Sequence, residues 1–238
     1  MEWITVESCP LCGSKLNQYY GDGRAPMLSH PDIFGGVTLA VITSYYQCLE
    51  CGLIRQSPRL SDASLSELYS SGEYRRLLNL SQEAIDADEL TRAKRIYPLI
   101  EGKFSHLDIG CSRGYLLEMS RDDGRKVLGV EPNAGYPNEG VPTVYTLQQV
   151  KSVWHTITCL HVLEHVTDPA DYAEQMMVLM AHGGRLILEV PSEKSQGGPL
   201  RLWHTFLFTP PVIMRLFTGL KLVDYQHTPH HLFIFEKS

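Results

Sequence analysis

Short apolar runs alternate with helical segments from Phe104 to the end of the chain, and this alternation limits the possible folds more than any other feature. Strands separated by helices form a parallel sheet with both faces covered. The runs are HLDIG, KVLGVE, TITCLHVL, GRLILEVP, LKLVDY and HLFIFE. Too few residues separate Leu220–Tyr225 from His231–Glu236 for a parallel crossover. We therefore expect a mostly parallel α/β sheet that ends in an antiparallel pair.

The residues before Phe104 do not show this alternation of apolar runs and helical segments. Residues 1–60 contain glycines, prolines and a β-type run at Val37–Tyr46, with little helical periodicity, so they predict a small β-rich module. Leu60–Tyr74 and Ser81–Ile100 have helical spacing, and Ser61 is a candidate amino-terminal cap. We expect a module over 1–60, linking helices over 61–103 and the α/β domain over 104–238.

Two CxxC pairs in the module indicate a metal site. Cys9 and Cys12 precede Gly13, and Cys48 and Cys51 precede a second glycine, so each pair can lie on a tight turn. Four thiolates complete a tetrahedral zinc shell and leave no open position, which favours a structural zinc ion. The alternatives are a redox dithiol pair or free thiols, although neither pair has the strand-to-helix setting of a redox motif.

The first run of the α/β domain leads into a glycine-bearing turn and a helix, the layout of a nucleotide site. Small residues at Gly110 and Gly114 allow the main chain to approach a ligand, and the helix that follows offers free N–H groups. The G-x-x-x-G spacing differs from that of dinucleotide-binding enzymes. Glu131, at the end of the next strand, suits ribose hydroxyls.

These residues resemble the class I S-adenosylmethionine-dependent methyltransferases. Their first motif reads acidic-x-Gly-x-Gly-x-Gly, and LDIGCSRG is similar, with Ser112 where the middle glycine usually lies. The resemblance implies a Rossmann-like methyltransferase sheet and S-adenosylmethionine as cofactor. The cofactor contacts that it implies are Asp108, Gly110, Ser112, Gly114, Tyr115, Glu131, Leu147 and His161.

The resemblance continues in HVLEHVTDP, which is similar to the fourth-strand motif of many small-molecule methyltransferases. With the zinc-type amino terminus, the pattern resembles bacterial sugar and small-molecule methyltransferases. His204 matches the histidine that follows the fifth strand in the sugar-modifying relatives, so we rank it first as general base. The other candidate catalytic residues are His161, Glu164 and His165. A structural role for each histidine is the alternative.

The composition of the chain limits the kinds of binding partner that we expect. A formal net charge of −6 and the lack of a basic run argue against nucleic acid. No apolar stretch is long enough to cross a bilayer, and the amino terminus does not resemble an export signal, so we expect a cytoplasmic protein without membrane contact. The expected partner is a small methyl acceptor. A non-catalytic scaffold with a partner-binding zinc module, and methylation of RNA or protein, are the alternatives.

Overall fold

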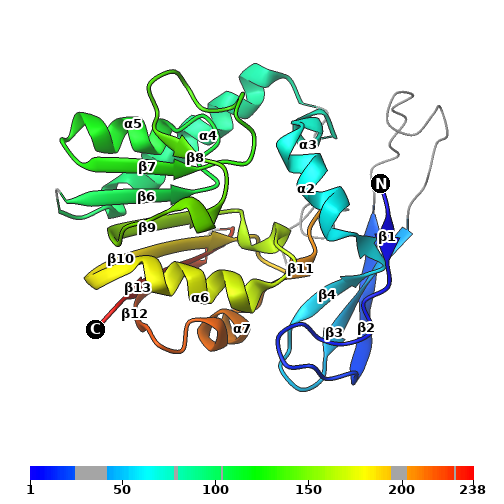
Figure 1. Ribbon diagram of the computed structural model, residues 1–238. Coiled ribbons are helices and arrows are strands. Elements are labelled where there is room, and N and C mark those ends of the chain that lie inside the picture. Colours follow the sequence, from blue (N-terminus) through cyan, green and yellow to red (C-terminus); the bar gives the residue numbers. More distant parts are fainter. Residues whose placement is uncertain (25–41, 78–79, 103, 194–202, 228) are drawn as a thin grey trace.

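The structure is a computed structural model that describes residues 1–24, 42–77, 80–102, 104–193, 203–227 and 229–238. Figure 1 shows a large sheet with helices on both faces and a small sheet beside it. The β-type run expected at Val37–Tyr46 lies partly outside the described residues. Among the described residues, no helix has the length and apolar character needed to cross a membrane.

Seven strands form the large sheet in the order β12-β13-β10-β9-β6-β7-β8. In that order they are Lys221–His227, His231–Glu236, Met180–Val190, Trp154–Leu160, Ser105–Ile109, Lys126–Val130 and Thr143–Val144. β13 is antiparallel to both of its neighbours, whereas all the other adjacent pairs are parallel. This arrangement confirms the expected fold class, including the antiparallel strand at the carboxyl terminus.

Side chains alternate between the two faces of this sheet because successive strand residues point in opposite directions. In β10, Leu186 and Leu188 pack in the largest core cluster, whereas Ile187 packs in a separate cluster on the other face. The first face is covered by α6 (Pro169–Leu179) and α7 (Pro210–Leu216). The second is covered by α4 (Gln82–Ile96) and α5 (Tyr115–Asp122).

The small sheet combines strands from both ends of the chain. Its order is β11-β4-β3-β2, and every neighbouring pair is antiparallel. In that order the strands are Phe206–Leu207, Ile54–Ser57, Ile42–Cys48 and Asn17–Arg24. Two further short strands, β1 (Trp3–Ile4) and β5 (Arg59–Leu60), pair beside it. A segment that follows the fifth strand of the α/β domain therefore completes the sheet of the amino-terminal module, which the sequence did not predict.

Within the described part of residues 61–104, three helices, rather than the expected two, connect the two sheets. They are α2 (Asp62–Ser70), α3 (Glu73–Leu77) and α4. Ser61 caps α2 as expected, because its hydroxyl accepts a hydrogen bond from the Ser64 amide. The helix expected over Leu60–Tyr74 is divided at Gly72, whose φ of +81° is a left-handed conformation that ends a helix. The short 3₁₀ segments are η1 (Tyr97–Leu99), η2 (Leu147–Gln149) and η3 (Leu163–His165).

Candidate functional site

The turn between β6 and α5 has the left-handed backbone that a glycine loop requires. Gly110 has φ +74° and Gly114 has φ +85°. A Cβ atom on Gly110 would lie 2.3 Å from Val162 Cγ2, and one on Gly114 would lie 2.8 Å from Val141 Cγ1. Side chains at these two positions would therefore require the surrounding packing to move. The loop leaves main chain, rather than side chains, beside the carboxyl end of the sheet.

Glu131 follows β7 and reaches across to this loop. Its carboxylate accepts hydrogen bonds from the Ser112 amide at 3.1 Å and from the Asn133 amide at 3.0 Å. Burial raises the pKa of Glu131. The two amides fix the orientation of the carboxylate, which lines a cavity at the carboxyl end of the sheet. It has further acceptor positions for the hydroxyl groups of a bound ribose.

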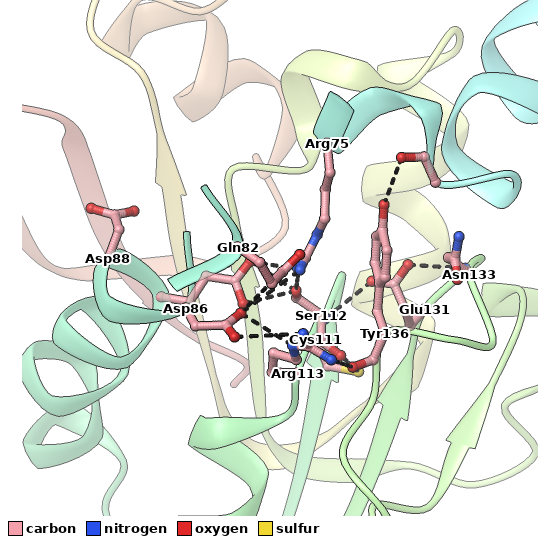
Figure 2. Close-up of polar contacts among 12 residues, drawn as sticks. Arg75, Gln82, Asp86, Asp88, Cys111, Ser112, Arg113, Glu131, Asn133 and Tyr136 are labelled. Carbon is pink, nitrogen blue, oxygen red and sulfur yellow. Dashed lines mark hydrogen bonds and ion pairs between the residues drawn. The ribbon is translucent and has the colours of Figure 1, made fainter. Parts of the chain in front are cut away.

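Figure 2 shows a network of charged groups over the glycine loop. The Ser112 hydroxyl donates to Glu89 at 2.8 Å and contacts Arg75 of α3. Arg75 forms an ion pair with Glu89 at 2.8 Å and lies over the ring of Tyr136. Ser112 has φ +50°, so this hydroxyl network holds a non-glycine residue in a left-handed conformation. Arg75, Glu89 and Tyr136 were not among the expected site residues, and no motif in the sequence marks them.

Asp108 lies behind the loop in a line of buried polar side chains. Its carboxyl group accepts from the Thr158 hydroxyl at 2.5 Å, and Thr158 contacts His106 Nε2 at 2.8 Å. His106 Nδ1 contacts the Ser120 hydroxyl at 2.8 Å. Burial raises the pKa of Asp108 to about 7 and lowers that of His106 to about 3, so His106 is neutral.

The pKa of Asp108 predicts a dependence of stability on pH. An unfolded Asp loses its proton near pH ~4, whereas folded Asp108 keeps its proton up to about pH 7. The folded state therefore binds more protons across this interval, and the contribution of Asp108 to the free energy of unfolding falls as pH rises from ~4 to ~7. Asp108→Asn is expected to reduce that fall in urea denaturation across the interval. The exposed variant Asp171→Asn should match the wild type, and an unchanged slope in Asp108→Asn would contradict the prediction.

A cavity of about 580 Å³ extends from the glycine loop along the carboxyl end of the sheet. It brings together eight of the expected site residues: Gly110, Ser112, Glu131, Leu147, His161, Glu164, His165 and His204. Asp108 and Tyr115 line a smaller adjoining cavity instead, together with Gly110 and Ser112. Gly114 lines neither cavity and caps the amino terminus of α5. One continuous space therefore connects the candidate cofactor loop with the candidate catalytic side chains.

The candidate catalytic side chains surround the carboxylate of Glu164, which is 1% exposed. His161 Nδ1 lies 3.4 Å and His165 Nε2 lies 3.8 Å from Glu164 Oε1. The rings of His165 and His204 meet edge to face, 4.9 Å apart. His161 also contacts Glu189 of β10 through Nε2 at 3.0 Å. The four expected residues are therefore close together at one end of the cavity.

The environments of these groups differ. Burial opposes the charged form of His161, but the nearby carboxylates of Glu164 and Glu189 raise its pKa above the ordinary value. Burial also opposes ionisation of Glu164, yet the adjacent His165 and His161 lower its pKa to about 2. Burial lowers the pKa of His165. At neutral pH, Glu164 is ionised and His165 favours its neutral form.

The amino-terminal module holds the segment that carries His204. The Tyr45 hydroxyl of β3 donates to the His204 carbonyl at 2.7 Å. The Gln56 amide donates to the Thr205 carbonyl at 2.9 Å, and the Thr205 amide donates to the Glu164 carbonyl at 2.8 Å. These bonds connect the module to both His204 and Glu164. The position of His204 therefore depends on the folding of the module.

Removal of one of these bonds should disturb the site without unfolding the module. Tyr45 is fully buried, so Tyr45→Phe deletes its hydroxyl while the ring keeps its packing. We expect an unfolding free energy about 1 kcal/mol lower and a several-fold fall in turnover. The matched control is Tyr19→Phe on the exposed side of β2, which should change neither quantity. Equal turnover in wild type and Tyr45→Phe would contradict the link between Tyr45 and His204.

The four module cysteines form one cluster. Cys9 Sγ lies 3.5 Å from Cys51 Sγ, Cys12 Sγ lies 3.6 Å from Cys48 Sγ, and all four sulfur atoms are within 4.8 Å of one another. Both turns have a left-handed glycine after the second cysteine. Burial opposes ionisation of Cys48, but the backbone amides of Cys51 and Glu50 lower its pKa to about 7. A donor set of four sulfurs in this arrangement fits zinc.

Comparison with known proteins identifies the family. The sequence model of a methyltransferase domain matches residues 71–225. The ubiquinone biosynthesis O-methyltransferase of Aeromonas salmonicida is 29% identical over 99 residues, which cover 34% of this chain and 41% of that protein. The enzyme of the same name from Sodalis glossinidius is 33% identical over 95 residues, covering 34% and 38%. The chain thus spans about two fifths of the length of these curated relatives.

Solved structures share the fold. Magnesium protoporphyrin IX methyltransferase of Synechocystis, solved with bound SAH, has a TM-score of 0.56 at 15% identity and covers 74% of this chain and 99% of its own. The 1,6-didemethyltoxoflavin-N1-methyltransferase of Burkholderia thailandensis has a TM-score of 0.59 at 17% identity, covering 80% and 97%. That structure contains 1,6-didemethyltoxoflavin and S-adenosylhomocysteine. At these identities the likeness concerns the fold.

Proposed function

The chain belongs to the family of methyltransferase domains, and we propose that it transfers the methyl group of S-adenosylmethionine to a small organic molecule. One observation carries this proposal. A single cavity connects the glycine loop and Glu131, which suit the cofactor, with the candidate catalytic side chains. Donor and acceptor could therefore be held side by side in one cavity.

The cofactor contacts follow from the geometry of the loop. Main-chain groups at Gly110 and Ser112 would lie against the cofactor, and Gly114 would keep the loop compact at the start of α5. Glu131 would accept hydrogen bonds from the ribose hydroxyls, and Leu147 would pack beside the adenine. When bound, S-adenosylmethionine supplies an electrophilic methyl group on a sulfonium. The protein residues bind the cofactor, align the acceptor and exclude water.

The acceptor would lie at the other end of the cavity, beside Glu164, His165 and His204. Transfer from a sulfonium needs an aligned acceptor and the loss of its proton. We propose that these side chains activate the acceptor. The acceptor that we propose is a sugar or a sugar-nucleotide-type metabolite, because the segment that contains His204 resembles that of sugar methyltransferases. The named relatives methylate other small molecules, so the chemical class of the acceptor is what an assay must determine.

We further propose a structural zinc ion in the cysteine cluster, in a module over 1–60 that is joined through residues 61–103 to the domain over 104–238. The support is the approach of four sulfur atoms to within 4.8 Å of one another. Reduced cysteines suit a cytoplasmic location, which we also propose. The module would hold β11, and with it His204, against the α/β domain.

The experiment that tests the function is isotope transfer. The full chain is incubated with S-adenosylmethionine labelled at the methyl carbon and with separate sets of sugar nucleotides, free sugars, phenols and heteroaromatic amines. Mass spectrometry then detects the labelled product. We expect labelling in the sugar or sugar-nucleotide sets. Labelling only among phenols or amines would refute the sugar proposal, and no labelling in any set would count against methyl transfer to small molecules of these classes.

A further inference from the structure

Three metal-binding side chains face one another at the acceptor end of the cavity. Glu164, His165 and His204 each offer one ligand atom, and these atoms all lie within 4.8 Å of one another. Two imidazoles and one carboxylate form a donor set for divalent first-row metal ions. All three residues line the cavity of about 580 Å³, so an ion held between them would keep open positions toward that space. This group is separate from the cysteine cluster.

The carboxylate of Glu164 lacks the hydrogen bonds that a buried charge needs. It is 1% exposed, and neither oxygen accepts a hydrogen bond from any residue in the described ranges. The nearest cationic candidates, His161 Nδ1 at 3.4 Å and His165 Nε2 at 3.8 Å, lie beyond strong hydrogen-bond distance. An ionised carboxylate in such a position is costly unless a cation neutralises it.

The contacts of His165 suit a metal ligand. His165 Nδ1 lies 3.0 Å from the Trp203 carbonyl and 2.8 Å from the Tyr69 hydroxyl. In metal-binding histidines, a hydrogen bond to the ring nitrogen that does not hold the ion usually fixes the orientation of the ring. The other ring nitrogen of His165, Nε2, is the one that lies 3.8 Å from Glu164.

We propose that Glu164, His165 and His204 bind a divalent first-row metal ion. In this arrangement His204 is a metal ligand rather than the general base that its sequence position suggests. The open positions suit oxygen atoms of an acceptor, and this part of the inference rests on the proposed methyl transfer. A hydroxyl group bound to the ion would release its proton to water at lower pH than a free hydroxyl. The metal site itself can be tested without cofactor or acceptor.

Cobalt(II) titration of the metal-free full chain separates the two sites by their spectra. The first equivalent is expected to fill the cysteine cluster and produce the intense charge-transfer bands of a cobalt–thiolate centre. A second equivalent is expected to produce only the weaker bands of nitrogen and oxygen ligands. Saturation after one equivalent, with no second spectral change, would overturn the proposal.

Substitution of each proposed ligand tests whether these three residues bind the second equivalent of cobalt(II). We expect His165→Ala, His204→Ala and Glu164→Gln each to lower the affinity for the second equivalent of cobalt(II) by about 100-fold or more. Each variant should keep the cobalt–thiolate bands, which show that the module is folded. His182→Ala, an exposed histidine at the start of β10, is the matched control and should bind two equivalents. If Glu164→Gln and His204→Ala bind the second equivalent of cobalt(II) as tightly as the wild type does, the ion lies elsewhere and the proposed site is refuted. Calorimetry with S-adenosylmethionine on the same preparations tests the proposed function separately.

Discussion

Replacement of His204 by alanine is expected to lower turnover by about 100- to 10,000-fold while the affinity for S-adenosylmethionine stays within about twofold. The two effects separate because His204 lies at the acceptor end of the cavity, whereas the glycine loop and Glu131 form the other end. Turnover is measured as the transfer of labelled methyl groups to one acceptor at saturating S-adenosylmethionine, and the affinity for S-adenosylmethionine is measured by calorimetry.

The matched control for His204→Ala is His182→Ala, since His182 is exposed and is not one of the residues that line the cavity. It should retain wild-type turnover and affinity. A His204→Ala variant with wild-type turnover would show that acceptor activation takes place elsewhere. A variant that also loses cofactor binding would instead assign His204 a role in the shape of the whole cavity.

Removal of the proposed zinc ion is expected to abolish turnover, because the module holds the segment that carries His204. The cysteine cluster ties together the turn that precedes β2 and the turn between β3 and β4, and β4 pairs with β11 beside His204. Structural zinc in small domains contributes on the order of 10 kcal/mol of folding free energy. The module should therefore lose its structure after chelation, and turnover should fall by about 100-fold or more.

The expected loss of turnover differs from simple inactivation in two measurable ways. Re-addition of one equivalent of zinc should restore activity, and its occupancy can be followed by metal analysis. Cofactor affinity should change less than turnover, because residues of the α/β domain and of α3 and α4 form the cofactor end. Full activity in a chain that metal analysis shows to be free of zinc would contradict the positioning role of the module.

The regular parts of the fold were predictable because their signals are local. Short apolar runs such as Gly184–Pro191 predict buried strands, and the helical segments between such runs predict a mostly parallel sheet. Glu131 was predictable because a strand end 21 positions after Gly110 lies at the same edge of a parallel sheet. The fold class could therefore be predicted from residue spacing and the family resemblance together.

The parts that could not be predicted depend on contacts between distant residues. β11 has two residues, and its partner strand lies about 150 positions earlier, so no periodic pattern indicates the pairing. Arg75 and Glu89 reach the glycine loop only because α3 and α4 fold over it. The sequence predicted one helix over Leu60–Tyr74 because the left-handed conformation of Gly72 depends on its surroundings. Each difference reflects tertiary packing rather than local preference.

Calorimetric titration of the zinc-loaded full chain with S-adenosylmethionine tests the central claim most directly. The matched variants are Glu131→Gln, which disturbs the carboxylate that faces the cavity, and Glu118→Gln, whose carboxylate accepts from Asn138 beside α5. We predict one saturable site in the wild type and in Glu118→Gln, with roughly 10- to 100-fold weaker binding in Glu131→Gln. No saturable binding to the wild type, or equal affinity in Glu131→Gln, would contradict the account of this cavity as a cofactor site.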